Sequence, residues 1–116
     1  MATLKISKDF TEYPGARYIT DGPFSGEAFF NELLREKFDE ALRANVILTV
    51  DLDDTAGYAS SFLSESFGRL AQEFGVDSVK KHLKIISRQE PDWKDRILND
   101  YIPNASKRQS QAFVNA

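Results

Sequence analysis

The sequence has no cysteine, a single histidine, a single tryptophan and no long apolar run. Without cysteine, disulfides, thiolate catalysis and cysteine-ligated metal sites are excluded. His82 alone likewise excludes any site that needs two histidines. Because no stretch of about 18 apolar residues is present, we expect no membrane-spanning helix. The first residues lack the charged start and long apolar stretch of a signal peptide, so we expect a cytoplasmic protein.

Length and charge narrow the class of protein. A chain of 116 residues builds one hydrophobic core and leaves no room for a second. The net charge of −3 creates no field that attracts nucleic acid, and the one basic cluster, between Lys80 and Arg88, lacks interleaved aromatic residues. We therefore expect one domain over residues 1–103, a polar tail over residues 104–116 and no nucleic-acid partner. The oligomeric state stays open.

The hydrophobic pattern predicts an α/β fold. Apolar residues recur at helical spacing after Ser25, which suits the N-cap position, and again after Ser60. The run 46–50 is almost wholly apolar, as in a strand that is buried on both faces. Because predicted strands and helices alternate, we expect a single α/β domain in which a mixed β-sheet is packed with helices. The predicted strands are residues 4–7, 17–20, 46–50 and 83–87, and the predicted helices are residues 25–43, 60–74, 77–81 and 91–102.

The junction between residues 46 and 68 concentrates polar chemistry. A predicted strand ends in three aspartates, and a short turn leads to Ser60 and Ser61 at the start of a predicted helix. Proteins of the α/β class place ligands and phosphates at such junctions, since the amides of a helix start attract anions. Two hypotheses follow: the aspartate nucleophile of a phosphatase, and an interaction switch centred on the serines.

The phosphatase hypothesis rests on Asp51 to Thr55, whose pattern D-x-D-x-T resembles the first motif of haloacid-dehalogenase-like phosphatases. In that motif the first aspartate attacks phosphate and the second is a general acid and base. The rest of the family pattern is missing: the motif lies mid-chain, little chain follows it, and Asp92 and Asp95 fall in a predicted helix. A small Mg-dependent phosphate-handling enzyme that uses Asp51 and Asp53 is therefore the alternative hypothesis.

Three segments carry a second resemblance. A G-P-x-S-G-E segment at residues 22–27 precedes a predicted helix, an apolar strand ends in aspartate, and S-S-F is followed by E-x-F-G-x-L at residues 60–70. Over roughly residues 11–102 these segments resemble the STAS-like family, a domain of unknown function related to anti-sigma-factor antagonist domains. The matching positions are Arg17, Gly22, Pro23, Ser25, Gly26, Glu27, Asp51, Ser60, Ser61, Phe62, Glu65, Phe67 and Gly68.

The resemblance implies a module that binds another protein, with no catalytic residue, cofactor or metal. In antagonist domains a serine at the start of this helix is phosphorylated by a GHKL-type ATPase or kinase, and the phosphate blocks binding. Such a partner is implied here, bound through residues 58–65 with the 21–27 loop alongside. The antagonist segment D-S-S/T-G is here Ala59-Ser-Ser-Phe62, without the acidic residue and the glycine. The implied contact residues are Arg17, Ser25, Glu27, Tyr58, Ser60, Ser61, Phe62 and Glu65.

Ordinary structural roles are available for the same residues. One of the two serines, Ser60 or Ser61, suits the N-cap of its helix. Arg17 and Glu27 are suited to a salt bridge or a capping contact. The aspartates after the strand suit a solvated turn. A last set, Phe24, Phe29 and Phe113, fits no helical stripe and suits either an exposed docking patch or a cover for the sheet edge.

Overall fold

The structure of the protein, a computed structural model, describes residues 2–105 and confirms an α/β domain. Its sheet has three strands in the order β1-β2-β3, all parallel. Leu4 pairs with Val50, which in turn pairs with Ile85. The strands are β1 (Ala2–Lys5), β2 (Leu48–Asp51) and β3 (Leu83–Ile86), and the helical segments are α1 (Ile6–Asp9), η1 (Ile19–Asp21), α2 (Gly26–Phe29), η2 (Phe30–Leu34), α3 (Arg35–Ala44), α4 (Ser60–Phe74), α5 (Val76–His82), α6 (Pro91–Arg96) and η3 (Ile97–Tyr101).

The mixed sheet expected from the sequence is wrong for the described residues, because the predicted strand at residues 17–20 is absent. Tyr18 is extended, but the chain then turns into the short 3-10 segment η1, which has no neighbouring strand. The first strand is also two residues earlier than predicted, and α1 follows it directly. Without residues 17–20 the remaining strands are all joined by helical crossovers, so they run parallel.

One continuous helix runs from Gly26 to Ala44 through α2, the π-helical η2 and α3. Its start matches the prediction, since Ser25 is the N-cap and its Oγ accepts a hydrogen bond from Ala28 N at 3.0 Å. Its end is set by Asn45, which adopts the left-handed conformation with φ 54°. Asparagine tolerates this conformation better than most residues, and it stops the helix before β2.

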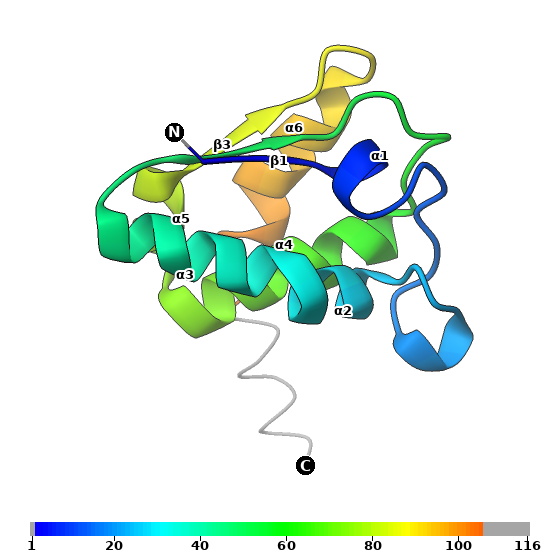
Figure 1. Cartoon of the computed structure of the whole chain (residues 1–116), viewed down its shortest axis with the longest axis horizontal. Helices are drawn as coiled ribbons and strands as arrows, with labels where there is room; N and C mark the ends of the chain where they lie inside the picture. Colours follow the sequence, from blue (N-terminus) through cyan, green and yellow to red (C-terminus); the bar gives the residue numbers. More distant parts are fainter. Residues whose placement is uncertain (1, 106–116) are drawn as a thin grey trace.

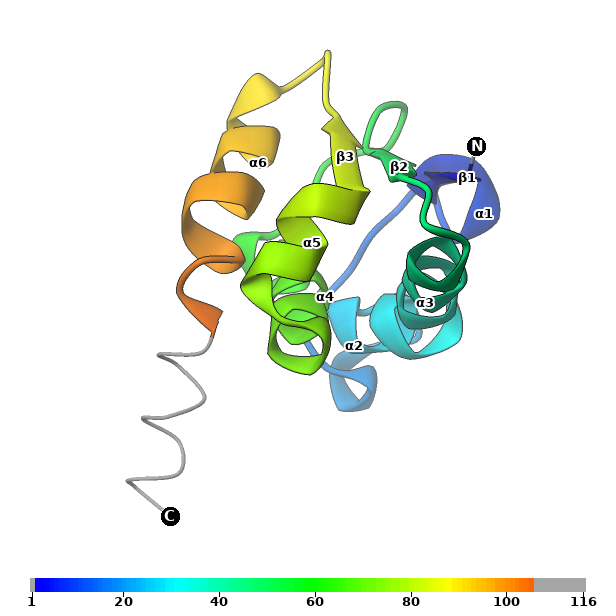
Figure 2. The same cartoon turned by 90° about the vertical axis from the view of Figure 1, so that its left-hand side faces the viewer.

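The helices α2 to α5 lie on one side of the sheet, and α6 flanks β3 (Figures 1 and 2). Strand residues alternate: Leu4, Val50 and Ile85 are buried toward the helices, and the positions between them are less buried. Parallel sheets normally have both faces covered. Here the open face carries mostly polar side chains such as Thr49 and Lys84, so its exposure to water costs little.

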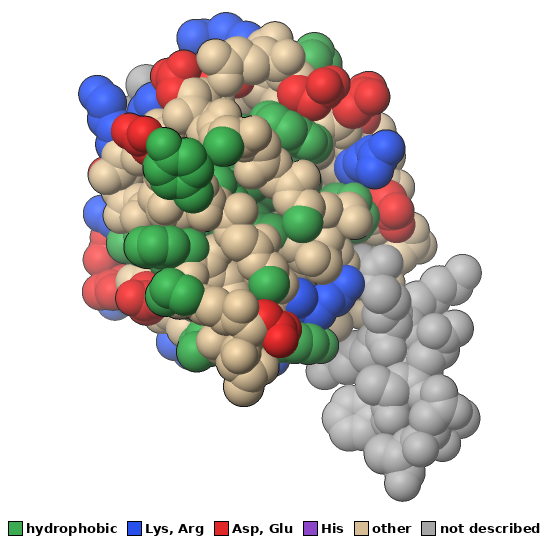
Figure 3. Space-filling model, turned by 90° about the vertical axis from the view of Figure 1, so that its right-hand side faces the viewer, with side chains coloured by type: hydrophobic (Ala, Val, Ile, Leu, Met, Phe, Trp, Pro, Cys, Tyr) green, Lys and Arg blue, Asp and Glu red, His purple; other side chains and the backbone are tan. Residues whose placement is uncertain are grey.

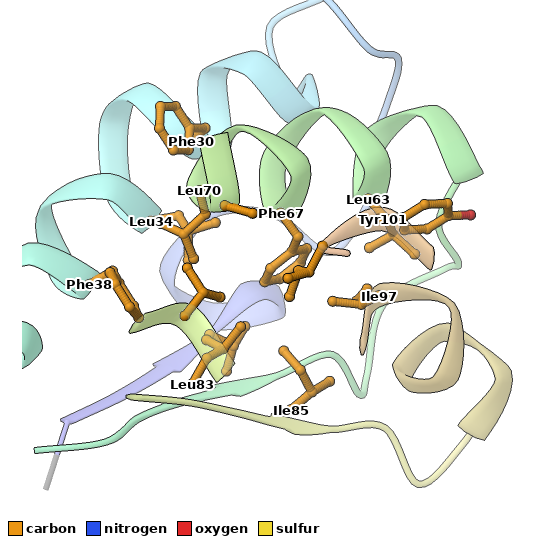
Figure 4. Close-up of a cluster of buried hydrophobic side chains, with 14 of the residues drawn as sticks. Phe30, Leu34, Phe38, Leu63, Phe67, Leu70, Leu83, Ile85, Ile97 and Tyr101 are labelled. Atoms are coloured by element: carbon orange, nitrogen blue, oxygen red, sulfur yellow. The ribbon is translucent and has the colours of Figure 1, made fainter. Parts of the chain in front are cut away.

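The hydrophobic core fills the space between this sheet and the helices. Figure 4 shows side chains from η2, α4, β3 and η3 pointing toward one another. Phe38, Phe67 and Leu70 are fully buried. Tyr101, which is 7% exposed, belongs to this core, and Trp93 packs against its edge.

Helices α2 and α4 approach each other closely at Gly26. A Cβ atom placed on Gly26 would lie 2.5 Å from the Phe62 backbone O and 3.0 Å from its Cα. Only glycine therefore lets the two helix starts touch backbone to backbone. This contact fixes the position of Ser60 and Ser61 relative to the chain that precedes α2.

The predicted tail, residues 104–116, lies outside the described residues except for Asn104 and Ala105. Ala105 is fully buried, and its carbonyl accepts a hydrogen bond from Gln72 Nε2 at 3.1 Å. Within residues 2–105, no helix combines the length and the hydrophobicity needed to cross a bilayer.

The Gly26 contact generates a prediction for stability. Gly26→Ala should lower the free energy of unfolding by about 2 kcal/mol, because the added methyl group overlaps backbone atoms that do not move without shifting α4. Urea denaturation followed by circular dichroism measures it. Gly15→Ala is the control, since its Cβ would lie 3.3 Å from the Phe24 backbone O, where a small shift suffices. Equal losses in the two variants would contradict the packing argument.

Candidate functional site

The candidate site is where the loop of residues 11–24 meets the starts of α2 and α4. Backbone hydrogen bonds tie this loop to α2: Gly26 N donates to Ala16 O at 2.9 Å, and Glu27 N donates to Arg17 O at 3.0 Å. Gly26 also packs on Phe62, at the start of α4. The 11–24 loop, the start of α2 and the start of α4 therefore form one surface. The structure thus brings together the segments that contain all the site residues expected from the sequence.

Ser25 and Glu27 have structural roles at this surface. Ser25 is fully buried, and its hydroxyl caps α2. Glu27 Oε1 accepts a hydrogen bond from Ile19 N at 2.9 Å and so anchors η1 to the helix start. Glu27 therefore forms a capping contact and not a salt bridge with Arg17. The Arg17 side chain pairs with Glu65 instead. Neither Ser25 nor Glu27 is placed to contact a partner as its main role.

Ser60 and Ser61 occupy the first turn of α4, and neither caps it. The N-cap is Ala59, which has no side-chain acceptor, so the capping interpretation of the serines is wrong. Ser60 is exposed and Ser61 is half-buried. The Phe62 and Leu63 amides donate to Ala59 O, at 3.1 and 3.4 Å. The first turn of a 15-residue helix therefore presents a serine hydroxyl to solvent without a side-chain cap.

Glu65 is the charged centre of the site. Its side chain is 10% exposed and lies between two arginines: Arg17 Nη1 is 3.8 Å from Oε1, and Arg69 Nε is 2.5 Å from Oε2. A carboxylate this buried requires such partners. Arg17 was expected from the sequence, whereas Arg69 was missed, although its spacing of four residues from Glu65 on one helix predicts the pair. The Arg17–Glu65 pair tethers the 11–24 loop to α4, whereas the Arg69–Glu65 pair lies within α4.

Tyr58 and Phe62 brace the loop that leads to the serines. Tyr58 Oη donates to Leu52 O at 2.8 Å, and burial raises the pKa of this phenol well above its ordinary value. Its ring packs on Phe62, at 5.7 Å between centroids, and edge-on against Trp93, at 4.7 Å. Phe62 is fully buried. Both residues therefore hold the α4 start in place rather than offering a free surface.

Exposed apolar side chains occur along the 11–24 loop, which Arg17 joins to Glu65. Figure 3 views the side of the molecule that carries the 11–24 loop, and hydrophobic side chains are spread over it. The most exposed ones in this loop are Tyr13 at 70%, Ile19 at 50%, Tyr18 at 45% and Phe24 at 44%. We call these four the loop patch. Of the three phenylalanines considered as a docking patch, Phe24 belongs to it, Phe29 is fully buried, and Phe113 lies outside the described residues.

The aspartates at the end of β2 and just after it form hydrogen bonds and ion pairs with other residues of the chain. Asp53 is buried, and its Oδ1 accepts from Arg88 N and Gln89 N, at 2.9 and 3.0 Å, which holds the turn after β3. Lys5 Nζ lies 3.2 Å from Asp51 Oδ2 and 2.9 Å from Asp54 Oδ2. In residues 2–105 no cluster of three or more acidic or histidine side chains is arranged to hold a metal ion.

The comparison with known families decides the classification. A family model described as a STAS-like domain of unknown function matches residues 25–93. The chain belongs to this family. The STAS-like match spans the sheet strands β2 and β3 and the whole of α4, including both serines and Glu65. No curated protein and no solved structure gives a significant match.

The two serine environments predict different effects of alanine. Ser25→Ala should lower the free energy of unfolding by about 1 kcal/mol, because it removes the cap of α2. Ser60→Ala should change it by less than about 0.5 kcal/mol, since the exposed hydroxyl makes no capping bond. Parallel urea titrations measure both. A larger loss in Ser60→Ala than in Ser25→Ala would contradict the assigned roles.

The Lys5 ion pairs predict a contribution to the free energy of unfolding that depends on pH. Lys5 lowers the pKa of Asp54 below its ordinary value of 3.8. A lowered pKa means that the ionised carboxylate stabilises the fold. This stabilisation is fully present above the unfolded-state pKa and is lost as pH falls through the folded-state pKa. The stability difference between wild type and Asp54→Asn should therefore be present at pH 7 and shrink below pH 3.8. A difference that stays constant from neutral to acid pH would refute it.

Proposed function

We propose that this STAS-like domain is a non-enzymatic regulatory module that binds another protein through the loop patch and the first turns of α4. The observation that carries the proposal is the combination at one surface of four exposed apolar side chains with an exposed, uncapped serine turn. Contiguous exposed apolar side chains typically mark sites of protein contact. Tyrosine and arginine are also enriched at the centres of such contacts.

The surface combines a rigid frame with a loop that this frame holds in place. Glu65 and its two arginines, the buried Phe62 and the Gly26 contact fix the frame. Tyr18 precedes η1 and Ile19 is its first residue, and Glu27 anchors this segment by accepting a hydrogen bond from Ile19 N. A partner that covered this loop would bury apolar side chains without rearranging the helices, and binding then costs little ordering.

A GHKL-type ATPase or kinase is the proposed partner, and serine phosphorylation is the proposed switch. Ser60 is the better acceptor of the two serines because it is the more exposed. A phosphate adds about −1.5 to −2 charges. The first amides of a helix accommodate that charge, while covering the phosphate with an apolar partner surface would strip it of water at a high free-energy cost. Phosphorylation would thus prevent binding without unfolding the domain.

The alternative, a Mg-dependent phosphate-handling enzyme, has less support from the same geometry. Asp51 is occupied by Lys5, and Asp53 accepts two backbone amides. An aspartate nucleophile needs a free oxygen that faces the substrate. A phosphoester panel assayed with and without magnesium, on wild type and Asp51→Asn, tests this second function. Magnesium-dependent turnover that Asp51→Asn abolishes would favour the enzyme over the binding module.

The loop patch generates a binding prediction. The tagged protein is purified gently from its own host, and the co-eluting ATPase is quantified by mass spectrometry. Ile19→Ser should reduce its recovery at least tenfold, because an apolar anchor is lost from the interface. Ile47→Ser is the matched control, since Ile47 is 47% exposed but lies outside the loop patch. Equal recovery with the two variants would contradict the proposed surface.

The switch has its own test. Ser60→Asp and Ser61→Asp should weaken binding of the captured ATPase while the melting temperature stays nearly unchanged, because Ser60 is exposed, Ser61 is only half-buried and neither residue caps the helix. Ser78→Asp on α5 is the control for an added charge elsewhere. Binding equal to that of wild type at matched stability would refute the switch.

A further inference from the structure

A groove between β3 and α6 lies outside the proposed interaction surface. It has a volume of about 470 Å³ and is lined by Lys84, Ile85, Ile86, Ser87, Arg88, Pro91, Lys94 and Asp95. This volume falls within the range of small-molecule pockets. In Figure 2, α6 flanks β3 on the side of the sheet away from β1. Neither the loop patch nor the serines of α4 contribute to it.

Three cations converge on this groove from different elements. Lys84 comes from β3, Arg88 from the turn after it and Lys94 from α6, and all three are exposed. Within residues 2–105 none of their side chains forms an ion pair or a hydrogen bond. Asp95 is the one acidic side chain in the lining, so the groove carries an excess of positive charge in a protein whose net charge is −3.

The turn that carries Arg88 is held in place by the buried Asp53. Asp53 Oδ1 accepts from Arg88 N and Gln89 N, and Ser87 Oγ donates to Glu90 O. The backbone beneath Arg88 is therefore fixed while its guanidinium stays free. Guanidinium groups form paired hydrogen bonds to phosphate oxygens, which suits this residue to phosphate recognition.

Part of the lining is apolar. Ile86 and Pro91 supply apolar atoms beside the polar Ser87 and Asp95, and Ile85 is only 2% exposed and belongs to the core behind them. A free inorganic anion would leave this apolar wall uncovered. An organic phosphate would place its phosphate among the cations and its carbon skeleton on the wall, and so bury apolar surface as it binds.

We propose that the groove between β3 and α6 binds a small organic phosphate ester through Lys84, Arg88 and Lys94. The probe is phenyl phosphate, with inorganic phosphate and a tetraglutamate peptide as comparison ligands. Each is titrated into the 15N-labelled full chain and followed by amide chemical shifts. Phenyl phosphate should shift amides of residues 84–95 in a saturable manner and bind at least fivefold more tightly than inorganic phosphate.

Variants separate specific binding from general attraction. Arg88→Ala should weaken phenyl phosphate binding about tenfold, the loss expected for one charge-assisted hydrogen bond. Arg96→Ala is the matched control, because Arg96 is exposed on α6 and does not line the groove. Equal weakening in both variants, or shifts spread over the surface, would overturn the proposal. Tighter binding of tetraglutamate than of phenyl phosphate would overturn it in favour of an acidic peptide, and equal affinity for inorganic phosphate would refute the role of the apolar wall.

Discussion

The close contact between Gly26 and the backbone of Phe62 is the constraint on which the rest of the site depends. It brings the starts of α2 and α4 together, and a side chain at residue 26 would separate them. Backbone hydrogen bonds join the 11–24 loop to the first residues of α2, so the position of this helix determines the position of the loop. The Arg17 side chain then forms an ion pair with Glu65, which joins the loop to α4 as well. One glycine thus determines where the loop, the serines and the ion pairs lie relative to one another.

The polar residues of the domain divide into those the fold uses and those it leaves free. In residues 2–105 every buried side-chain nitrogen and oxygen atom has a hydrogen-bond partner. Asp53 and Ser25 belong to this buried group, and the partly exposed Glu27 is bonded as well; each of the three holds a turn or a helix start. Ser60 and the cations beside β3 remain exposed. Such exposed groups contribute little to the stability of the fold and are available to bind other molecules. They lie on two separate surfaces, the start of α4 and the groove beside β3.

Much of the fold was predictable because local signals agree with the global structure. Ser25 capped the first long helix as expected, and the apolar stripe after Ser60 produced α4. The loop was the least predictable part. The segment of residues 17–20, which lies between two turns, suited a short strand, yet a strand needs a neighbour, and the tertiary structure supplied none.

The site was predictable in its members and not in their roles. Family resemblance selected Arg17, Glu27 and Glu65, but which acid pairs with Arg17 depends on how the loop folds onto α4. Neither serine caps α4, because the chain places Ala59 at the N-cap. Side-chain exposure, which distinguishes Phe24 from Phe29, is a property of the packed molecule and has no signature in a short segment of sequence.

The central claim is that the loop patch and the α4 start form one protein-binding surface. Hydrogen–deuterium exchange of the domain alone and in complex with a protein partner captured from its host tests this claim most directly. The account predicts slower exchange confined to residues 13–27 and 58–65 in the complex. Protection that instead covers the open face of the sheet or α6, with no change in those two segments, would contradict it.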